Sequence, residues 1–134
     1  MTNGRKAPMP RRAPQEPPGP ASPQTAPAPQ APGGAVVVRG RFTAPVDPEA
    51  IARDWAQRGF SCRLWVDAPG QEWNDFVHAT RELVTVVEGR LDFEVGGQRL
   101  ELVPGDELLI PRDARHSVKN VHRGTSRWLY GYGR

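Results

Sequence analysis

Two histidines and one glutamate are spaced so that they could hold a metal ion together. His78 and Glu82 lie four residues apart, where one expected strand ends and the next begins, and His116 follows a turn further along the chain. Two imidazoles and one carboxylate that converge on one point leave open coordination positions, an arrangement suited to Fe(II) and similar divalent ions. The same three ligands suit a catalytic zinc, which keeps one position for water or substrate.

The spacing leaves a second interpretation open for these side chains. A histidine in a strand is more often part of the core or the surface than a metal ligand. Without a metal, His78 and His116 would be hydrogen-bonded within a polar cavity of the fold, because buried polar groups need partners. Which interpretation holds depends on the elements that carry the two histidines.

Short strands dominate the structure predicted for the chain after residue 59. The stretch 60–67 alternates between two sets of side chains, which is typical of a half-buried strand: Phe60, Cys62, Leu64 and Val66 against Ser61, Arg63, Trp65 and Asp67. Further strands are expected at 72–80, 83–88, 91–95, 98–102, 107–110, 116–121 and 126–132, with Gly- or Pro-containing turns between most of them. Short strands at such regular intervals indicate an antiparallel sandwich or barrel.

One helix is expected before these strands. Asp47 can cap its start, Pro48 suits the first helical position, and Glu49 complements the positive end of the helix dipole. Apolar residues recur at helical spacing from Ile51 onward, and Gly59 is well placed to end the helix. The expected fold class is therefore all-β with one short helix in front of the strands.

The N-terminal segment has a different composition. Residues 1–34 contain ten of the fifteen prolines and no aromatic residue. Such a segment cannot bury enough apolar surface to offset the entropy of ordering it. The sequence therefore predicts a disordered, proline-rich basic tail over residues 1–34 and one folded domain over residues 35–134.

The formal net charge of +3 belongs to that tail. The tail carries four basic residues against one acidic residue, and the remainder of the chain carries 14 of each sign. A nucleic-acid-binding domain would show its positive charge on the fold. No nucleic-acid partner is therefore expected.

Localisation is predicted from what the chain lacks. The single cysteine, Cys62, excludes an internal disulfide. No apolar run approaches the length of a membrane span, and no apolar core follows the basic residues near the N-terminus as it would in a secretory signal. A cytoplasmic protein with no membrane partner is expected.

Two stretches resemble the signature motifs of the cupins. In 73–89, His78 stands at the second histidine of the first motif, followed at the motif's spacing by Glu82 and Gly89. In 105–120, the second motif is matched, with an aspartate where glycine is usual, by Gly105, Pro111, Asp113, His116 and Asn120. The two motifs stand in the usual order and cover nearly half of the folded part. The folded part is thus identified as a small single-domain cupin.

This resemblance implies a cupin-type antiparallel β-barrel, or jelly roll, and a bound divalent ion, with Fe, Mn, Ni, Cu and Zn as the candidates. Cupins with a complete site usually hold the ion with three histidines and one glutamate. Phe76 stands at the position of the first of those histidines and cannot bind a metal. The metal ligands carried over to this chain are therefore His78, Glu82 and His116, and a barrel that has lost its metal remains the alternative.

The reaction stays open, because cupins include dioxygenases, isomerases, epimerases and decarboxylases and a fold does not fix a function. The first hypothesis is a metal-dependent enzyme that acts on a small molecule. The second is a non-catalytic barrel that binds or senses a small ligand, with or without a metal. A homodimer is expected in either case, since cupins often pair through their sheets.

The residues around the expected ligands add further expectations. Phe76 and His78 are two apart in the expected strand, so both side chains should face the same side. Phe76 would then narrow the cavity beside His78 and make it more apolar. His122 lies outside both motifs and is expected at the surface. The alternating aromatic residues near the C-terminus are expected to pack or to line the cavity: Trp128, Tyr130 and Tyr132.

Overall fold

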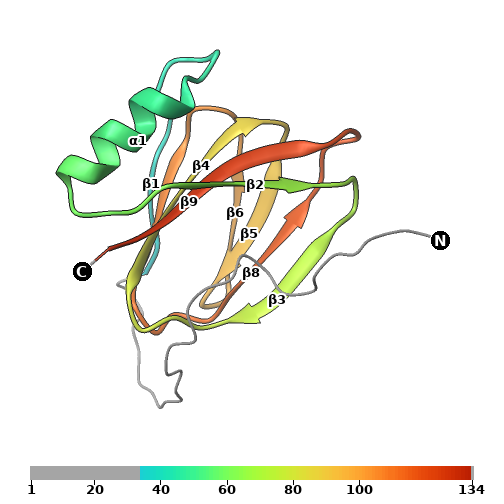
Figure 1. Ribbon diagram of the computed structural model, residues 1–134. Coiled ribbons are helices and arrows are strands. Elements are labelled where there is room, and N and C mark those ends of the chain that lie inside the picture. The colour runs from blue at the N-terminus through green and yellow to red at the C-terminus, as the bar shows by residue number, and fades with distance from the viewer. Residues whose placement is uncertain (1–33, 134) are drawn as a thin grey trace.

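The computed structural model describes residues 34–133, which form one helix and two antiparallel sheets (Figure 1). The prediction of an all-β barrel preceded by one short helix is confirmed. The predicted disordered tail lies, apart from Gly34, outside the described residues. Within the described part, no helix has the length and apolar character that a membrane span requires.

The elements follow one another in the order that the alternating pattern indicates. Their bounds are β1 (Val36–Val38), α1 (Pro48–Gln57), β2 (Arg63–Asp67), β3 (Glu72–Phe76), β4 (Arg81–Glu88), β5 (Leu91–Val95), β6 (Gln98–Leu102), β7 (Glu107–Ile110), β8 (His116–Asn120) and β9 (Ser126–Gly133).

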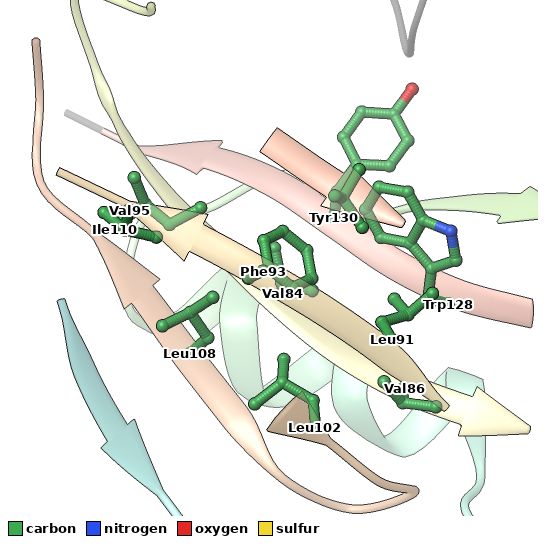
Figure 2. Packing of buried hydrophobic residues seen from close by; sticks show 11 residues of the cluster. Val84, Val86, Leu91, Phe93, Val95, Leu102, Leu108, Ile110, Trp128 and Tyr130 are labelled. Atoms are coloured by element: carbon green, nitrogen blue, oxygen red, sulfur yellow. The ribbon is translucent and has the colours of Figure 1, made fainter. Parts of the chain in front are cut away.

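The strands form two layers around one core. The first sheet has the strand order β1-β7-β4-β9-β2, and the second has the order β3-β8-β5-β6. Each sheet turns one face inward onto a cluster of buried side chains that fills the barrel (Figure 2). The cluster consists of Val84, Val86, Leu91, Phe93, Val95, Leu102, Leu108, Ile110, Val118, Trp128 and Tyr130. Burial of these side chains is the main favourable contribution to folding.

The helix α1 covers the outer face of the five-stranded sheet. Its start is as predicted, because the Asp47 side chain accepts a hydrogen bond from the Glu49 N–H at 3.0 Å and Pro48 occupies the first turn. Ile51 and Trp55 are fully buried against the sheet residues Leu83 and Leu129. Amphipathic packing of this kind, rather than intrinsic propensity, stabilises a helix of ten residues.

Strand β2 has the predicted alternation, but the buried face is not the one that its apolar residues indicate. Leu64 and Val66 are exposed on the outer face, with exposed fractions of 43% and 52%. Trp65 and Asp67 face inward instead, because Trp65 pairs with the buried Trp128 of β9. The helix covers the part of the outer face near Phe60 and Cys62 and leaves the rest of β2 uncovered.

Strand β3 is shorter than the predicted strand 72–80. Its pairing with β8 shifts register between Trp73 and Phe76, and Asp75 in this interval has a φ of 67°. A positive φ is a left-handed conformation that interrupts regular pairing. Residues 77–80 therefore form a loop, and His78 lies in that loop rather than in a strand.

A buried carboxylate fixes α1 on the sheet. Glu107 of β7 is 3% exposed and accepts a hydrogen bond from the Trp55 Nε1–H at 3.0 Å. Arg58, directly after the helix, donates two further bonds to the same carboxylate at 2.8 and 2.9 Å. The helix is thus held by both its apolar face and a paired charge.

We expect Glu107→Ala to lower the free energy of unfolding by about 2–4 kcal/mol, because it leaves the buried indole N–H of Trp55 without an acceptor and removes the buried half of the ion pair with Arg58. Urea unfolding followed by circular dichroism measures the change. Glu101→Ala is the control, since its ion pair with Arg90 lies at the surface and should contribute less than about 1 kcal/mol. Equal effects of the two substitutions would contradict the role given to Glu107.

Candidate metal centre

Glu82 occupies the inward face of β4 near one end of the barrel. Its neighbours across the sheet are Ile110 on β7 and Tyr132 on β9, so the backbone around it is paired on both sides. The residue is 4% exposed, and its Oε1 atom is buried and accepts no hydrogen bond. A buried carboxylate oxygen without a donor is costly unless another group compensates its charge.

His116 approaches Glu82 from the opposite sheet. It is the first residue of β8, is 3% exposed, and pairs with Phe76 of β3. Its Nδ1 lies 3.0 Å from the backbone carbonyl of Ala114, so in the neutral ring Nδ1 carries the proton and Nε2 has a free lone pair. This Nε2 lies 3.3 Å from Glu82 Oε1.

His78 reaches the same point from the loop between β3 and β4. Its Nε2 lies 3.4 Å from Glu82 Oε1, and its ring packs against those of Tyr132 and His116 with centroid separations of 5.0 Å each. The loop is tied to the turn before β8, because the Asp113 N–H donates to the His78 carbonyl at 2.7 Å. The segments that carry the two histidines therefore hold each other in place.

Asp113 explains one departure from the cupin motif. Its φ is 65°, a left-handed conformation that glycine adopts freely and that aspartate tolerates better than most residues. The motif glycines Gly89 and Gly105 also have positive φ, and a Cβ at either position would overlap Ser126 or Phe42. The motif spacing thus reflects turn geometry as well as ligand positions.

The predicted set of His78, Glu82 and His116 is brought together by the fold. One ligand atom from each residue lies within 4.8 Å of the others, and the three come from β4, β8 and the connecting loop 77–80. Two imidazole nitrogens and one carboxylate oxygen on one side of a cavity fit a divalent transition-metal ion, which would also compensate the charge of Glu82. That these residues bind a metal remains a prediction.

The charge state of His78 favours this use. Burial lowers the pKa of His78 from 6.5 to about 4, the nearby His116 lowers it further, and Glu82 opposes the shift. The ring is therefore neutral at pH 7, and a neutral imidazole is the form that binds metal ions.

The three side chains open into a small cavity with apolar walls. Its volume is about 10 Å³, which is about the space that one water molecule needs. Phe76 lies beside both imidazoles, with ring centroids 5.9 Å from His78 and 5.6 Å from His116. The remaining wall is made of Phe93, Val118, Trp128 and Tyr132.

Most of the aromatic residues expected near the candidate ligands line the cavity. Phe76 and His78 both line the cavity as predicted, although His78 arrives there from a loop and not from strand alternation. Trp128 and Tyr132 line the cavity, and Tyr130 packs in the core. His122 is exposed. Sequence reasoning missed Phe93 and Val118, whose alternation on β5 and β8 was the available signal.

The comparisons with known proteins agree with this architecture. A family model described as Cupin domain matches residues 63–132. A curated protein from Streptomyces cyaneus named Polyketide synthase CurC is 35% identical over 68 residues, which are 50% of this chain and 44% of that protein. The chain thus spans less than half the length of this relative.

Two solved structures illustrate the similarity of fold. A cupin 2 domain-containing protein from Halorhodospira halophila has a TM-score of 0.59 and 21% identity, over 75% of each chain. A sugar phosphate isomerase of the cupin superfamily from Silicibacter pomeroyi has a TM-score of 0.50 and 24% identity, over 57% of this chain and 51% of that chain.

We expect the ring C–H signals of His78 in metal-free protein not to titrate between about pH 5.5 and 8, unlike those of a solvated histidine, and to move only near pH 4. Because the pKa in the folded protein lies below the usual 6.5, the unfolded chain binds the proton first, and the contribution of His78 to stability falls as the pH drops from 6.5 toward 4. NMR titration, with His78→Gln to assign the signals, measures this. A midpoint near 6.5 would contradict the burial of the ring.

Proposed function

The chain belongs to the cupin family, and from that premise we propose that His78, Glu82 and His116 bind one divalent transition-metal ion and that the protein is an enzyme acting on a small molecule. The observation that carries the proposal is the buried Glu82 Oε1, which accepts no hydrogen bond and lies 3.4 and 3.3 Å from the two Nε2 atoms. A cation among these three atoms would remove the cost of the isolated oxygen.

The chemistry of the donor set supports Fe, Mn, Ni, Cu or Zn rather than Mg or Ca, which prefer oxygen ligands alone. When bound, such an ion would act as a Lewis acid toward a substrate oxygen. Reactions of the dioxygenase or isomerase type are compatible with three protein ligands and open positions. The fold leaves the choice among them open.

The chain's own residues would contribute orientation and exclusion of water. The Ala114 carbonyl fixes the ring of His116 with Nε2 toward the cavity. The bond from the Asp113 N–H holds the loop that carries His78. Phe76 and Phe93 cover the ligands with apolar surface, which strengthens electrostatic interactions inside the cavity.

A second candidate function is a binding or sensing barrel without catalysis. Phe76 favours it, because this side chain stands where a fourth ligand would face the ion and fills part of the cavity. Stoichiometric binding of a small ligand without turnover would distinguish this candidate from an enzyme.

A homodimer in the cytoplasm completes the proposal. The uncovered outer face of β2 supports the dimer, since Leu64 and Val66 are exposed there on an edge strand. Its aromatic neighbours Trp128 and Tyr130 are buried inside the barrel and are not part of that surface. Sedimentation velocity of the full chain tests the dimer.

We expect protein purified without a His tag to contain close to one equivalent of Fe, Mn, Ni, Cu or Zn by elemental analysis. Glu82→Gln and His116→Ala should each lose the metal, with a decrease in affinity larger than the roughly 10–100-fold that follows loss of a supporting residue. His122→Ala is the matched control, because His122 is exposed and lies outside the cavity. A parent that stays metal-free after reconstitution would rule out the metalloenzyme.

We expect Phe76→His to tighten metal binding by about tenfold or more, because an imidazole at position 76 would add a nitrogen ligand from the residue that pairs with His116 across strands β3 and β8. The absorption spectrum of the Co(II)-loaded protein should change with the coordination number. Phe76→Leu, which removes the ring without adding a ligand, should keep the parent spectrum. Identical spectra for the histidine variant and the parent would show that position 76 does not face the ion.

A further inference from the structure

The cavity beside the candidate ligands offers few polar side-chain atoms to a bound molecule. Apart from the three candidate ligands, the described residues that line it are Phe76, Phe93, Val118, Trp128 and Tyr132. Of these, Trp128 and Tyr132 carry a nitrogen or an oxygen in the side chain. The side-chain hydrogen bonds that the walls can give to a ligand therefore depend on these two residues.

The indole N–H of Trp128 is already used by the fold. It donates to Asp67 Oδ2 at 3.0 Å, and Asp67 is 3% exposed. Figure 2 shows the indole nitrogen pointing away from Phe93, whose ring the indole meets edge to face with centroids 6.0 Å apart. Trp128 therefore presents hydrocarbon to the cavity. The Tyr132 hydroxyl is the side-chain donor that remains among the described wall residues.

The backbone places Tyr132 beside Glu82. The two residues are direct neighbours across β4 and β9. The Tyr132 N–H donates to Ser61 Oγ at 3.0 Å, and the Tyr132 carbonyl accepts from the Ser61 N–H at 3.0 Å. Both backbone groups of Tyr132 thus point toward Ser61 and away from β4. Antiparallel neighbours that exchange no backbone bonds with each other bring their side chains closest.

The Tyr132 ring also contacts a second candidate ligand. It meets the His78 ring edge to face, with centroids 5.0 Å apart and an interplanar angle of 64°. On its other side it packs against the buried Tyr130, with centroids 5.9 Å apart. The ring is therefore held at the wall of the cavity, next to Glu82 and His78.

The candidate site would have an electrostatic preference of its own. A divalent ion bound by one carboxylate and two imidazoles leaves one positive charge uncompensated, because imidazole binds metals in its neutral form. Among the described residues, the walls supply no further charged side chain to balance it. An uncompensated charge in apolar surroundings is unfavourable. A ligand atom with a single negative charge is therefore preferred at the ion over a neutral one.

The size of the cavity limits what can reach the ion. The ion would lie among the three ligand atoms, which are all within 4.8 Å of one another. The cavity that they open into has a volume of about 10 Å³, the space of about one water molecule. One atom of a ligand fits there. The rest of a larger molecule has to stay on the side nearest solvent, where His78 is 11% exposed and Tyr132 is half-buried.

We propose that the molecule accepted by this site presents one ionised oxygen to the ion, as a small carboxylate does, and that Tyr132 is the specificity-determining residue whose hydroxyl donates a hydrogen bond to that oxygen. The inference deepens the proposed function and rests on it, because it presupposes the ion. Hydrogen bonds to a charged acceptor are about twice as strong as those between neutral groups. Tyr132 thus discriminates in the same direction as the ion, in favour of an anionic oxygen.

Fluoride is the first probe, because it carries one negative charge, accepts hydrogen bonds and is a single atom. Its binding to the full chain loaded with Co(II) is measured from the visible absorption and from broadening of the fluorine NMR signal. We expect Tyr132→Phe to weaken fluoride binding by about fivefold or more, since the ring stays and the donor is lost. Tyr130→Phe is the matched control, because Tyr130 packs in the core cluster, and it should bind fluoride like the parent. Equal affinities of Tyr132→Phe and the parent would overturn the role of Tyr132.

Formate and formamide test the charge of the ligand, since they are nearly equal in size and differ in charge. We expect formate to bind the Co(II)-loaded protein at least about tenfold more tightly than formamide, because formate balances the charge of the site. Equal or tighter binding of formamide, or binding of neither compound, would refute the preference for an anionic oxygen.

Elemental analysis of the same samples separates this inference from the proposed function. Protein that takes up no cobalt would refute both, because the inference presupposes the ion. Protein that holds about one equivalent of cobalt and does not prefer formate would refute the inference alone and support the metal site. Tyr132→Phe should hold as much cobalt as the parent. A loss of cobalt from this variant would contradict the donor role, because it would make Tyr132 a metal ligand.

Discussion

The fold has to compensate the charge of carboxylates that it buries on both faces of the five-stranded sheet, and the compensating groups differ from one carboxylate to the next. Glu107 accepts bonds from an indole and an arginine and thereby holds α1 on the outer face. Asp67 accepts three indole N–H bonds where β2, β3 and β9 meet. Glu82 has two imidazoles beside it and an oxygen that accepts no hydrogen bond. The first two carboxylates accept hydrogen bonds from groups of the fold itself, whereas Oε1 of the third has no donor and is the atom beside which we propose a cation.

The other buried side-chain atom without a partner in the described part helps to judge this contrast. The Thr85 hydroxyl lies on β4, on the face toward α1, where its strand neighbours are Leu129 and Glu107. It is a neutral group, and its isolation costs far less than that of a charged oxygen. It also lies away from the cavity, whose walls do not include it. Glu82 is therefore distinguished by charge and by the two nitrogens that converge on it, and not by an unsatisfied atom alone.

Much of this arrangement could be predicted from local sequence because local rules decide it. The helix start follows from Asp47 and Pro48, and the succession of short strands along the chain follows from alternation broken by Gly and Pro. What could not be predicted depends on tertiary contacts. The apolar Leu64 and Val66 face outward because Trp65 must meet Trp128 inside the barrel. His78 lies in a loop because Asp75 takes a left-handed conformation, which no period-2 pattern reveals. The convergence of His78, Glu82 and His116 was nevertheless predicted from the motif spacing, and their role as metal ligands stays a prediction.

The location of the candidate site explains how this fold accommodates Phe76 in place of a ligand. The core cluster fills the barrel interior between the sheets, and the candidate ligands occupy one end of it, near the loop 77–80. Phe76 lies on an edge strand with interrupted pairing, so a change of side chain there disturbs few backbone bonds. The phenylalanine ring at this position presents apolar surface beside the two candidate histidine ligands. A substitution at position 76 can therefore change which molecules the cavity admits without disturbing the core contacts that stabilise the barrel.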